Sequence, residues 1–154
     1  MDIFIDTSVI IPFLIESPAT MEVRGFFENF HGSFHTCSMV YQETLFIGMR
    51  LIAVERLKIR SYIDLKEYII KNGHSFADDF YEKVSLLFGN MTIHRDSADT
   101  DHIMQLMVDY GLFPADAVIA ATSIEQKITL FASRDKDYSR ICYLKLFPFN
   151  ENFR

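Results

Sequence analysis

The sequence predicts an α/β domain whose mainly parallel sheet is covered by helices on both faces. Short apolar segments of strand length alternate along the chain with amphipathic segments of helix length. The first segment, Ile3–Ile5, is apolar at every position, as expected for a strand buried on both faces of a parallel sheet. With 154 residues, 49% of them apolar, the chain is long enough for one domain with its own core.

The first strand leads directly into polar residues. Ile3–Ile5 ends at Asp6, and the hydroxyl side chains of Thr7 and Ser8 can cap a short helix that ends near Leu14. The chain therefore delivers an acid to the carboxyl end of its first strand.

Six further helices are predicted where apolar residues recur every three or four positions between turn residues. In chain order they are Met21–Phe30, Ser38–Leu57, Tyr62–Ile70, Phe76–Phe88, Ile103–Tyr110 and a helix that begins at Pro114. Ser38 is expected to cap the second of them. The third and fourth form a helical hairpin insertion near residues 61–89, for which packing is the default role.

Four further strands are predicted from short apolar runs between these helices. They are Phe34–Cys37, Met91–His94, Ile128–Ala132 and Tyr143–Phe147. Residues 1–147 are expected to form the domain, and residues 148–154 a C-terminal tail.

Charge and cysteine content narrow the class of protein. A net charge of −6 argues against indiscriminate coating of nucleic acid, but it allows a local basic rim beside an acidic centre. Cys37 and Cys142 lack metal-ligand or disulfide spacing, so both are expected to be small buried hydrophobic residues. With no targeting segment or membrane span expected, these features predict a cytoplasmic protein.

Four carboxylates stand where predicted strands end or the next helices begin. Asp6 ends the first strand, and Asp135 follows the fourth. Asp116 lies on the apolar face of an alanine-rich helix, and Glu43 lies just over one turn into the helix after the second strand. Each alone could be a cap or a solvated charge, but the carboxyl ends of parallel strands share one edge, where ligands gather.

Carboxylates that converge repel one another, and a hard divalent cation compensates that repulsion. Ligation by oxygen alone favours Mg²⁺ or Mn²⁺ over zinc. Such an ion suits phosphodiester hydrolysis, because it lowers the pKa of a bound water and offsets charge on the phosphate. No nucleophilic serine or cysteine is then required.

Four motifs, in this order, resemble those of the PIN-domain ribonucleases. They are Ile3-Phe4-Ile5-Asp6-Thr7-Ser8-Val9, Gln42-Glu43, Asp116-Ala117-Val118-Ile119-Ala120-Ala121-Thr122 and Ser133-Arg134-Asp135-Lys136-Asp137-Tyr138. The resemblance runs from residue 2 to about residue 146 and is greatest to the VapC-type toxins of toxin–antitoxin pairs. It implies a PIN-like three-layer α/β/α fold with a mainly parallel central sheet of four to five strands.

The resemblance also implies roles for individual residues. The catalytic, metal-binding acids would be Asp6, Glu43, Asp116 and Asp135, and the cofactor would be Mg²⁺ or Mn²⁺. Ser8 would orient Asp6 by a hydrogen bond, and Ser133 would do similar work near Asp135. Arg134 and Lys136 flank Asp135 and are expected to meet substrate.

Two residues of the last motif depart from the commonest family pattern. Ser133 stands where threonine is frequent, which keeps the hydroxyl, and Tyr138 stands where phenylalanine is frequent, which keeps an aromatic ring. The added length near residues 61–89 is the larger departure, and it leaves the subfamily open.

The sequence therefore predicts a divalent-metal-dependent endoribonuclease, the toxin of a toxin–antitoxin pair, with RNA as substrate. An antitoxin protein and a second copy of the chain are its expected partners. Two alternatives stay open: a non-catalytic PIN-like module that binds RNA or protein, and an RNA-processing PIN nuclease without a toxin role. A haloacid-dehalogenase-type phosphatase fits poorly, because Ser8 occupies the position of its second aspartate.

The other notable residues receive structural interpretations. The histidines show no metal-ligand spacing, and the basic stretch between Arg50 and Arg60 is interpreted as a solvated face. Six apolar side chains are expected in the core: Phe26, Phe27, Phe46, Met49, Phe80 and Phe88.

Overall fold

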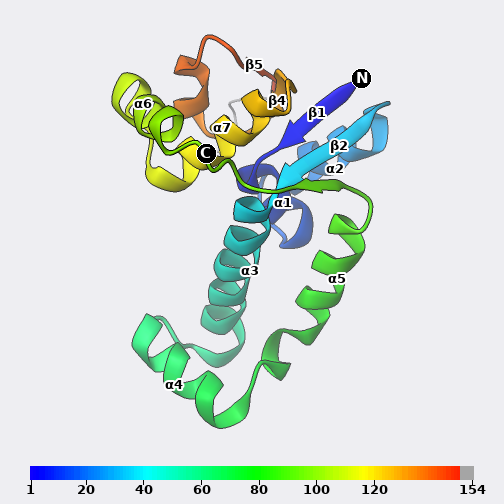
Figure 1. The fold of residues 1–154 in the computed structure, drawn as a ribbon. Helices are drawn as coiled ribbons and strands as arrows, with labels where there is room; N and C mark the ends of the chain where they lie inside the picture. Colours follow the sequence, from blue (N-terminus) through cyan, green and yellow to red (C-terminus); the bar gives the residue numbers. More distant parts are fainter. Residues whose placement is uncertain (150–154) are drawn as a thin grey trace.

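Five parallel strands form the central sheet, in the order β3-β2-β1-β4-β5 (Figure 1). The structure is a computed structural model that describes residues 1–149. The strands are β1 (Asp2–Ile5), β2 (Ser33–Cys37), β3 (Thr92–His94), β4 (Leu130–Ala132) and β5 (Lys145–Leu146). The predicted α/β class, with a parallel central sheet, is confirmed.

Each predicted helix is present. The helices are α1 (Thr7–Leu14), α2 (Thr20–Asn29), α3 (Ser38–Ile52), α4 (Tyr62–Asn72), α5 (Asp78–Phe88), α6 (Thr100–Tyr110) and α7 (Pro114–Glu125). A π-helical turn, Ala53–Leu57, continues α3 until Lys58 adopts a left-handed conformation with φ of 58°. In the described part of the chain, no single helix is long and apolar enough to cross a membrane, although the bent pair α6 and α7 passes that test together.

The core is centred on β1, the middle strand of the sheet. Ile3, Phe4 and Ile5 are completely buried, as their uninterrupted apolar run predicts. The Phe4 ring stacks on Phe131 of β4, with ring centroids 5.6 Å apart. Because β1 has neighbours on both sides, the residue that follows it, Asp6, lies at the middle of the carboxyl edge of the sheet.

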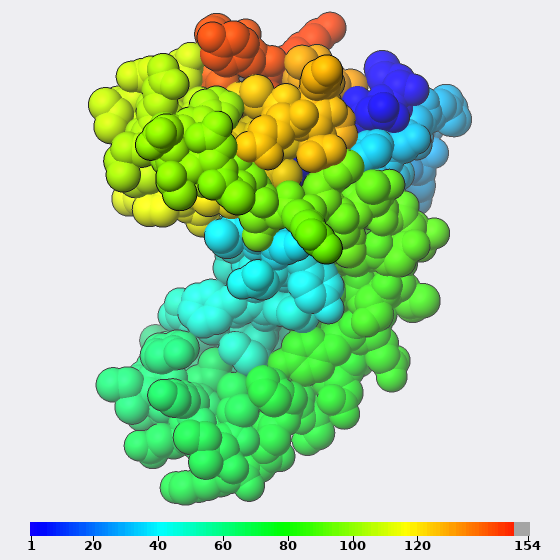
Figure 2. All heavy atoms as spheres, viewed as in Figure 1, coloured from blue at the N-terminus to red at the C-terminus, as the bar shows by residue number. Residues whose placement is uncertain are grey.

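Helices α3, α4 and α5 form a helical arm, residues 38–88, that extends away from the sheet (Figure 1). Helix α4 lies at its far end, with Ile63 and Ile70 68% and 75% exposed. The space-filling view shows the surface hollowed between this end of the arm and the α6–α7 region, over α3 (Figure 2). The hairpin predicted near residues 61–89 therefore corresponds to α4 and α5, and its assignment as an insertion remains a proposal.

The predicted cap of α3 is wrong. The Ser38 hydroxyl donates to the carbonyl of His94 at 3.3 Å instead of to its own helix. The helix start is satisfied from another part of the chain, because the Asp96 carboxylate accepts the Met39 N–H at 2.7 Å. A cap supplied across the fold leaves no signal in the local sequence.

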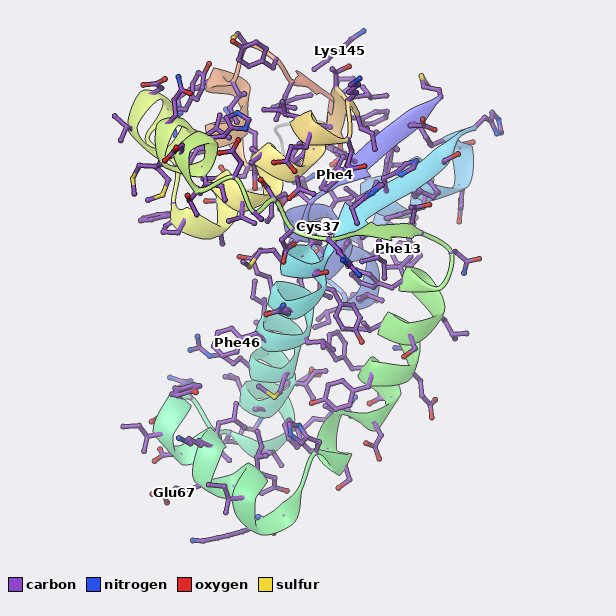
Figure 3. The ribbon with its side chains drawn as sticks, in the orientation of Figure 1. Phe4, Phe13, Cys37, Phe46, Glu67 and Lys145 are labelled. Carbon is purple, nitrogen blue, oxygen red and sulfur yellow. The ribbon has the colours of Figure 1, made fainter. Side chains whose placement is uncertain are left out.

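Two burial predictions are also wrong. Cys37 is buried, but Cys142 is exposed beside the Tyr110 hydroxyl. Phe46 is 43% exposed and projects from α3 (Figure 3), because the arm leaves that face of the helix without a covering element. The predicted tail falls mostly outside the described residues, although Phe149 packs on Phe26 of α2.

Candidate active site

Asp6 joins the sheet to the first helix. Its backbone N–H donates to the carbonyl of Ala132 in β4 at 3.0 Å, which extends the sheet by one residue. Its carboxylate accepts the Ser8 N–H at 3.2 Å, so Asp6 itself caps α1. The expectation that Thr7 or Ser8 caps this helix is therefore wrong. Only 4% of Asp6 is exposed, which makes its negative charge costly.

Hydroxyl donors converge on one oxygen of Asp6. Ser8 Oγ and Ser133 Oγ donate to Asp6 Oδ2 at 2.6 and 2.9 Å. The two serines are themselves fixed, because Ser8 Oγ accepts the Arg134 N–H and Ser133 Oγ accepts the Asp135 N–H. Donors on Oδ2 hold the carboxylate in one orientation and leave Oδ1 directed at other partners.

Glu43 reaches the site from α3. This helix packs against α1, and the Thr7 hydroxyl of α1 donates to Glu43 Oε2 at 2.8 Å. The pKa of Glu43 is raised, first by burial and then by the negative charge of Asp6, and only the Thr7 hydrogen bond opposes the rise. The Asp6 charge acts on Glu43 although the two residues are 37 positions apart in sequence.

Asp116 lies in the first turn of α7, two residues after Pro114. Helix α7 is buried along most of its length, which leaves Asp116 half-buried. Its pKa is raised from 3.8 to about 6, first by desolvation and then by the negative charges of Asp6, Asp135 and Glu43. These interactions show that the structure brings all four sequence-predicted acids to one place.

Asp135 follows β4 and begins a short 3₁₀-helical turn, Lys136–Arg140. One of its carboxylate oxygens accepts the Asp137 N–H at 2.8 Å, which caps this turn. The turn places Tyr138 beneath the acids, with its hydroxyl 3.3 Å from Asp116 Oδ1.

The four acids (Asp6, Glu43, Asp116 and Asp135) have the properties expected of a divalent-cation site. The pKa values of Asp6, Glu43 and Asp116 are all raised, with burial as the largest cause in each case. Raised pKa values mean that the hydrogen-bond donors and positive charges of the protein do not fully offset the cost of ionising these buried carboxylates. A carboxylate-only donor set of this kind fits Mg²⁺ or Mn²⁺.

Two contributions to the site were missed from the sequence. Thr7 was considered only as a helix cap, but its hydroxyl supports Glu43. Tyr138 was considered only as an aromatic ring, but its hydroxyl contacts two of the acids. The role of Thr7 could have been predicted from the order Asp-Thr-Ser. If Asp6 caps the helix, the Thr7 hydroxyl is available for another hydrogen bond.

Two of the basic residues singled out from the sequence form ion pairs. Arg134 pairs with Glu22 of α2, and both side chains are mostly buried. Within the basic stretch on the arm, Arg56 makes two hydrogen bonds to the Asp79 carboxylate, at 2.7 and 2.8 Å. Lys136 follows Asp135 in the chain and is exposed.

A different group of potential metal ligands lies between α6 and α7. Ligand atoms of Asp99, His102 and Glu125 lie within 4.8 Å of one another, although His102 was assigned no role from the sequence. Both carboxylates are exposed, and they already accept hydrogen bonds, from the His102 N–H and from Ser97. This group is separate from the four acids.

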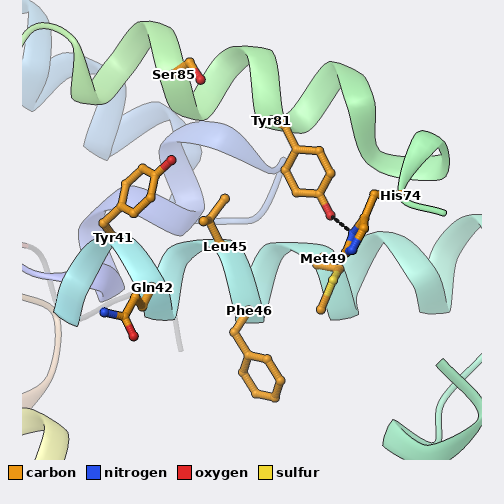
Figure 4. Close-up of a pocket in the computed structure, with 8 residues that line it drawn as sticks. All are labelled: Tyr41, Gln42, Leu45, Phe46, Met49, His74, Tyr81 and Ser85. Carbon is orange, nitrogen blue, oxygen red and sulfur yellow. Dashed lines mark hydrogen bonds between the residues drawn. The ribbon is translucent and has the colours of Figure 1, made fainter. Parts of the chain in front are cut away.

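An apolar groove of about 530 Å³ lies between α3 and α5 (Figure 4). Its wall includes Tyr41, Leu45 and Tyr81, with the Tyr81 hydroxyl hydrogen-bonded to His74 Nδ1 at 2.9 Å. None of the four acids lines it. The groove is therefore separate from the site that the four acids form.

The fold and the site together define an α/β domain with a carboxylate centre at the carboxyl edge of a parallel sheet. The family model of the PIN domain matches residues 3–143, and the chain therefore belongs to the PIN domain family. The family resemblance predicted from the four motifs is confirmed. No curated protein sequence matches the chain.

Solved VapC and VapBC structures share this fold. VapC20 of Mycobacterium tuberculosis, a toxin that cleaves the sarcin–ricin loop, is 16% identical with a TM-score of 0.65, over 95% of this chain and 99% of that one. VapBC2 of Rickettsia felis, bound to promoter DNA, is 16% identical with a TM-score of 0.61, over 97% and 100%. VapBC-1 of Haemophilus influenzae is 13% identical with a TM-score of 0.60, over 96% and 97%.

Proposed function

We propose that this chain is a divalent-metal-dependent endoribonuclease that hydrolyses RNA phosphodiester bonds. The observation that carries the proposal is the convergence of four acids at one place, where burial first, and then the charges of the other three acids, raise the pKa of Asp116 to about 6. Membership of the PIN domain family supports the same activity.

Asp6, Glu43, Asp116 and Asp135 would hold Mg²⁺ or Mn²⁺. When bound, the ion supplies Lewis-acid chemistry that lowers the pKa of water and offsets negative charge on the phosphate. The protein's own contribution is orientation, because hydroxyl donors fix the acids before the ion arrives. Lys136 is proposed to contact the RNA backbone near Asp135, and Arg134 to act there mainly through its pairing with Glu22.

The toxin role is the second part of the proposal. It rests on the fold shared with VapC20 and with the two VapBC assemblies, together with the motif resemblance. An antitoxin protein is the proposed partner, and the apolar groove between α3 and α5 offers a surface for it. We propose the cytoplasm as the site of action, because RNA targets are present there.

We propose a homodimer through exposed apolar side chains of the arm beside this groove, whose lining includes Phe46. Phe46, Leu51 and Tyr62 are 43%, 44% and 55% exposed, and the Phe46 and Tyr62 rings lie 6.1 Å apart. Exposed apolar side chains that gather in this way are typical of an interface. Light scattering of the purified protein tests this assembly, and a monomer at high concentration would contradict it.

The nuclease proposal is tested by incubating a pool of structured RNAs with Mn²⁺ or with EDTA. Wild type, Asp116→Asn and Asp101→Asn are compared, since Asp101 is an exposed acid of α6 outside the site. We expect metal-dependent cleavage by wild type and Asp101→Asn, and its loss in Asp116→Asn. Equal cleavage by all three proteins would reject the site assignment.

The toxin role is tested by expression in a bacterial host. Growth arrest by wild type that disappears in Asp6→Asn would support it. Cleavage in vitro without growth arrest would favour an RNA-processing nuclease. Absence of both cleavage and Mn²⁺ binding would favour a non-catalytic module that binds RNA or protein.

A further inference from the structure

Tyr138 is a completely buried tyrosine whose hydroxyl lies between two acids of the site. It belongs to the 3₁₀-helical turn after Asp135, and its ring packs on Phe131 of β4 with centroids 4.7 Å apart. The hydroxyl oxygen is 3.5 Å from Asp6 Oδ1 and 3.3 Å from Asp116 Oδ1. The Tyr138 hydroxyl therefore contacts two carboxylates from different elements, Asp6 after β1 and Asp116 in α7.

The two oxygens of Asp6 differ in their hydrogen-bond partners. Asp6 Oδ2 already accepts hydrogen bonds from the two serine hydroxyls and from the Ser8 N–H. Its Oδ1 is the oxygen that faces the Tyr138 hydroxyl, which also contacts Asp116 Oδ1. Since one hydroxyl has one hydrogen, the Tyr138 hydrogen is shared between two carboxylates, which links their positions.

Packing accounts for the ring of Tyr138 but not for its hydroxyl. A phenylalanine ring would fill the same space against Phe131, without bringing a polar group into the core. A buried tyrosine hydroxyl requires a partner, and this one is directed at the two acids. The hydroxyl therefore has a role in the acid site that the ring alone could not perform.

We propose that Tyr138 is a positioning residue that sets the separation between Asp6 and Asp116 for a small divalent cation. The proposal deepens the proposed metal-dependent function and rests on it. A hydroxyl shared by both acids limits their movement apart, so that the site is organised for Mg²⁺ or Mn²⁺ before the ion binds. Larger Ca²⁺ takes more ligands at longer distances, so that a fixed separation also disfavours it.

The test is Tyr138→Phe, with Tyr81→Phe as the matched control. Tyr81→Phe also removes a hydrogen-bonded hydroxyl, the one that contacts His74 in the apolar groove (Figure 4). Isothermal titration calorimetry gives the Kd of each protein for Mn²⁺ and for Ca²⁺. Urea unfolding in EDTA reports whether the fold is retained.

We expect Tyr138→Phe to weaken Mn²⁺ binding about tenfold, and Ca²⁺ binding by less, so that discrimination between the ions narrows. Tyr81→Phe should bind both ions like wild type. Wild-type Mn²⁺ affinity in Tyr138→Phe would overturn the positioning role and leave the metal site intact. Equal loss of both ions with loss of cooperative unfolding would also overturn it, because the hydroxyl would then serve the core. Absence of Mn²⁺ binding by wild type would instead reject the metal site on which the proposal rests.

Discussion

Replacing Asp116 with asparagine should stabilise the metal-free protein at neutral pH. The side chain is half-buried, and the charges of Asp6, Asp135 and Glu43 act on it. Its pKa rises from 3.8 to about 6 on folding, so the folded state favours the neutral form. Asparagine has nearly the same shape and no charge, and it can still accept a hydrogen bond from Tyr138.

The size of the effect follows from the pKa. A change from 3.8 to about 6 corresponds to about 3 kcal/mol, at about 1.4 kcal/mol for each unit of pKa. Solvent screening of a half-exposed group reduces this to about 1 to 1.5 kcal/mol. Because the folded-state pKa is the higher one, this stability is fully present below 3.8 and is lost as pH rises through about 6.

Urea unfolding in EDTA measures this directly. At about pH 7.5, Asp116→Asn should exceed wild type by about 1 to 1.5 kcal/mol, and the difference should nearly vanish at about pH 4. Asp101→Asn is the control, because an acid in the first turn of α6 favours the helix dipole, and its loss should give no gain. An Asp116→Asn protein no more stable than wild type at pH 7.5 would refute the raised pKa of Asp116 on which the reasoning rests, as would a gain that persists unchanged at pH 4.

Three further predictions concern packing, orientation and pH. Gly48→Ala should lower the free energy of unfolding by about 2 to 3 kcal/mol in urea, because the new Cβ would lie 2.0 Å from the Phe80 ring; an unchanged midpoint would contradict this. Thr7→Val should weaken Mn²⁺ binding several-fold in calorimetry, because Glu43 loses a 2.8 Å hydrogen bond, and Thr7→Ser should retain it. Burial first, and then the neighbouring His35 of β2, lower the pKa of His94 from 6.5. The contribution of His94 to the free energy of unfolding should therefore be complete above pH 6.5 and be lost as pH falls below it. His94→Gln should make the urea midpoint depend less on pH over this range.

The α/β fold and the four acids could be predicted from the sequence, because both depend on local patterns. Apolar runs and helical periodicity identified the strands and helices, and the parallel order placed strand ends at one edge. The residues that orient the acids were less accessible. Ser8 lies two positions from Asp6, so its contact is local, whereas Ser133 reaches Asp6 only because β1 and β4 are neighbours in the sheet.

Predictions failed where a residue distant in sequence contacts or leaves exposed the segment in question. Asp96 caps α3 from beyond β3, which displaced the predicted role of Ser38. The pairing of Arg134 with Glu22 joins residues 112 positions apart, which no local pattern could predict, and contact of Arg134 with substrate stays a prediction. Phe46 fits the apolar stripe of α3, but no predicted pattern could say that its side of the arm stays uncovered.

The sequence by itself determined the order of the elements, the apolar core of β1 and the identity of the four acids, because these follow from residue type and local periodicity. Only the tertiary structure decided how the acids act on one another, since the pKa of Asp116 depends on burial and on charges from three other segments. It also decided that the Tyr138 hydroxyl lies between Asp6 and Asp116, because hydrogen bonds depend on distance and direction in space, which sequence separation does not fix.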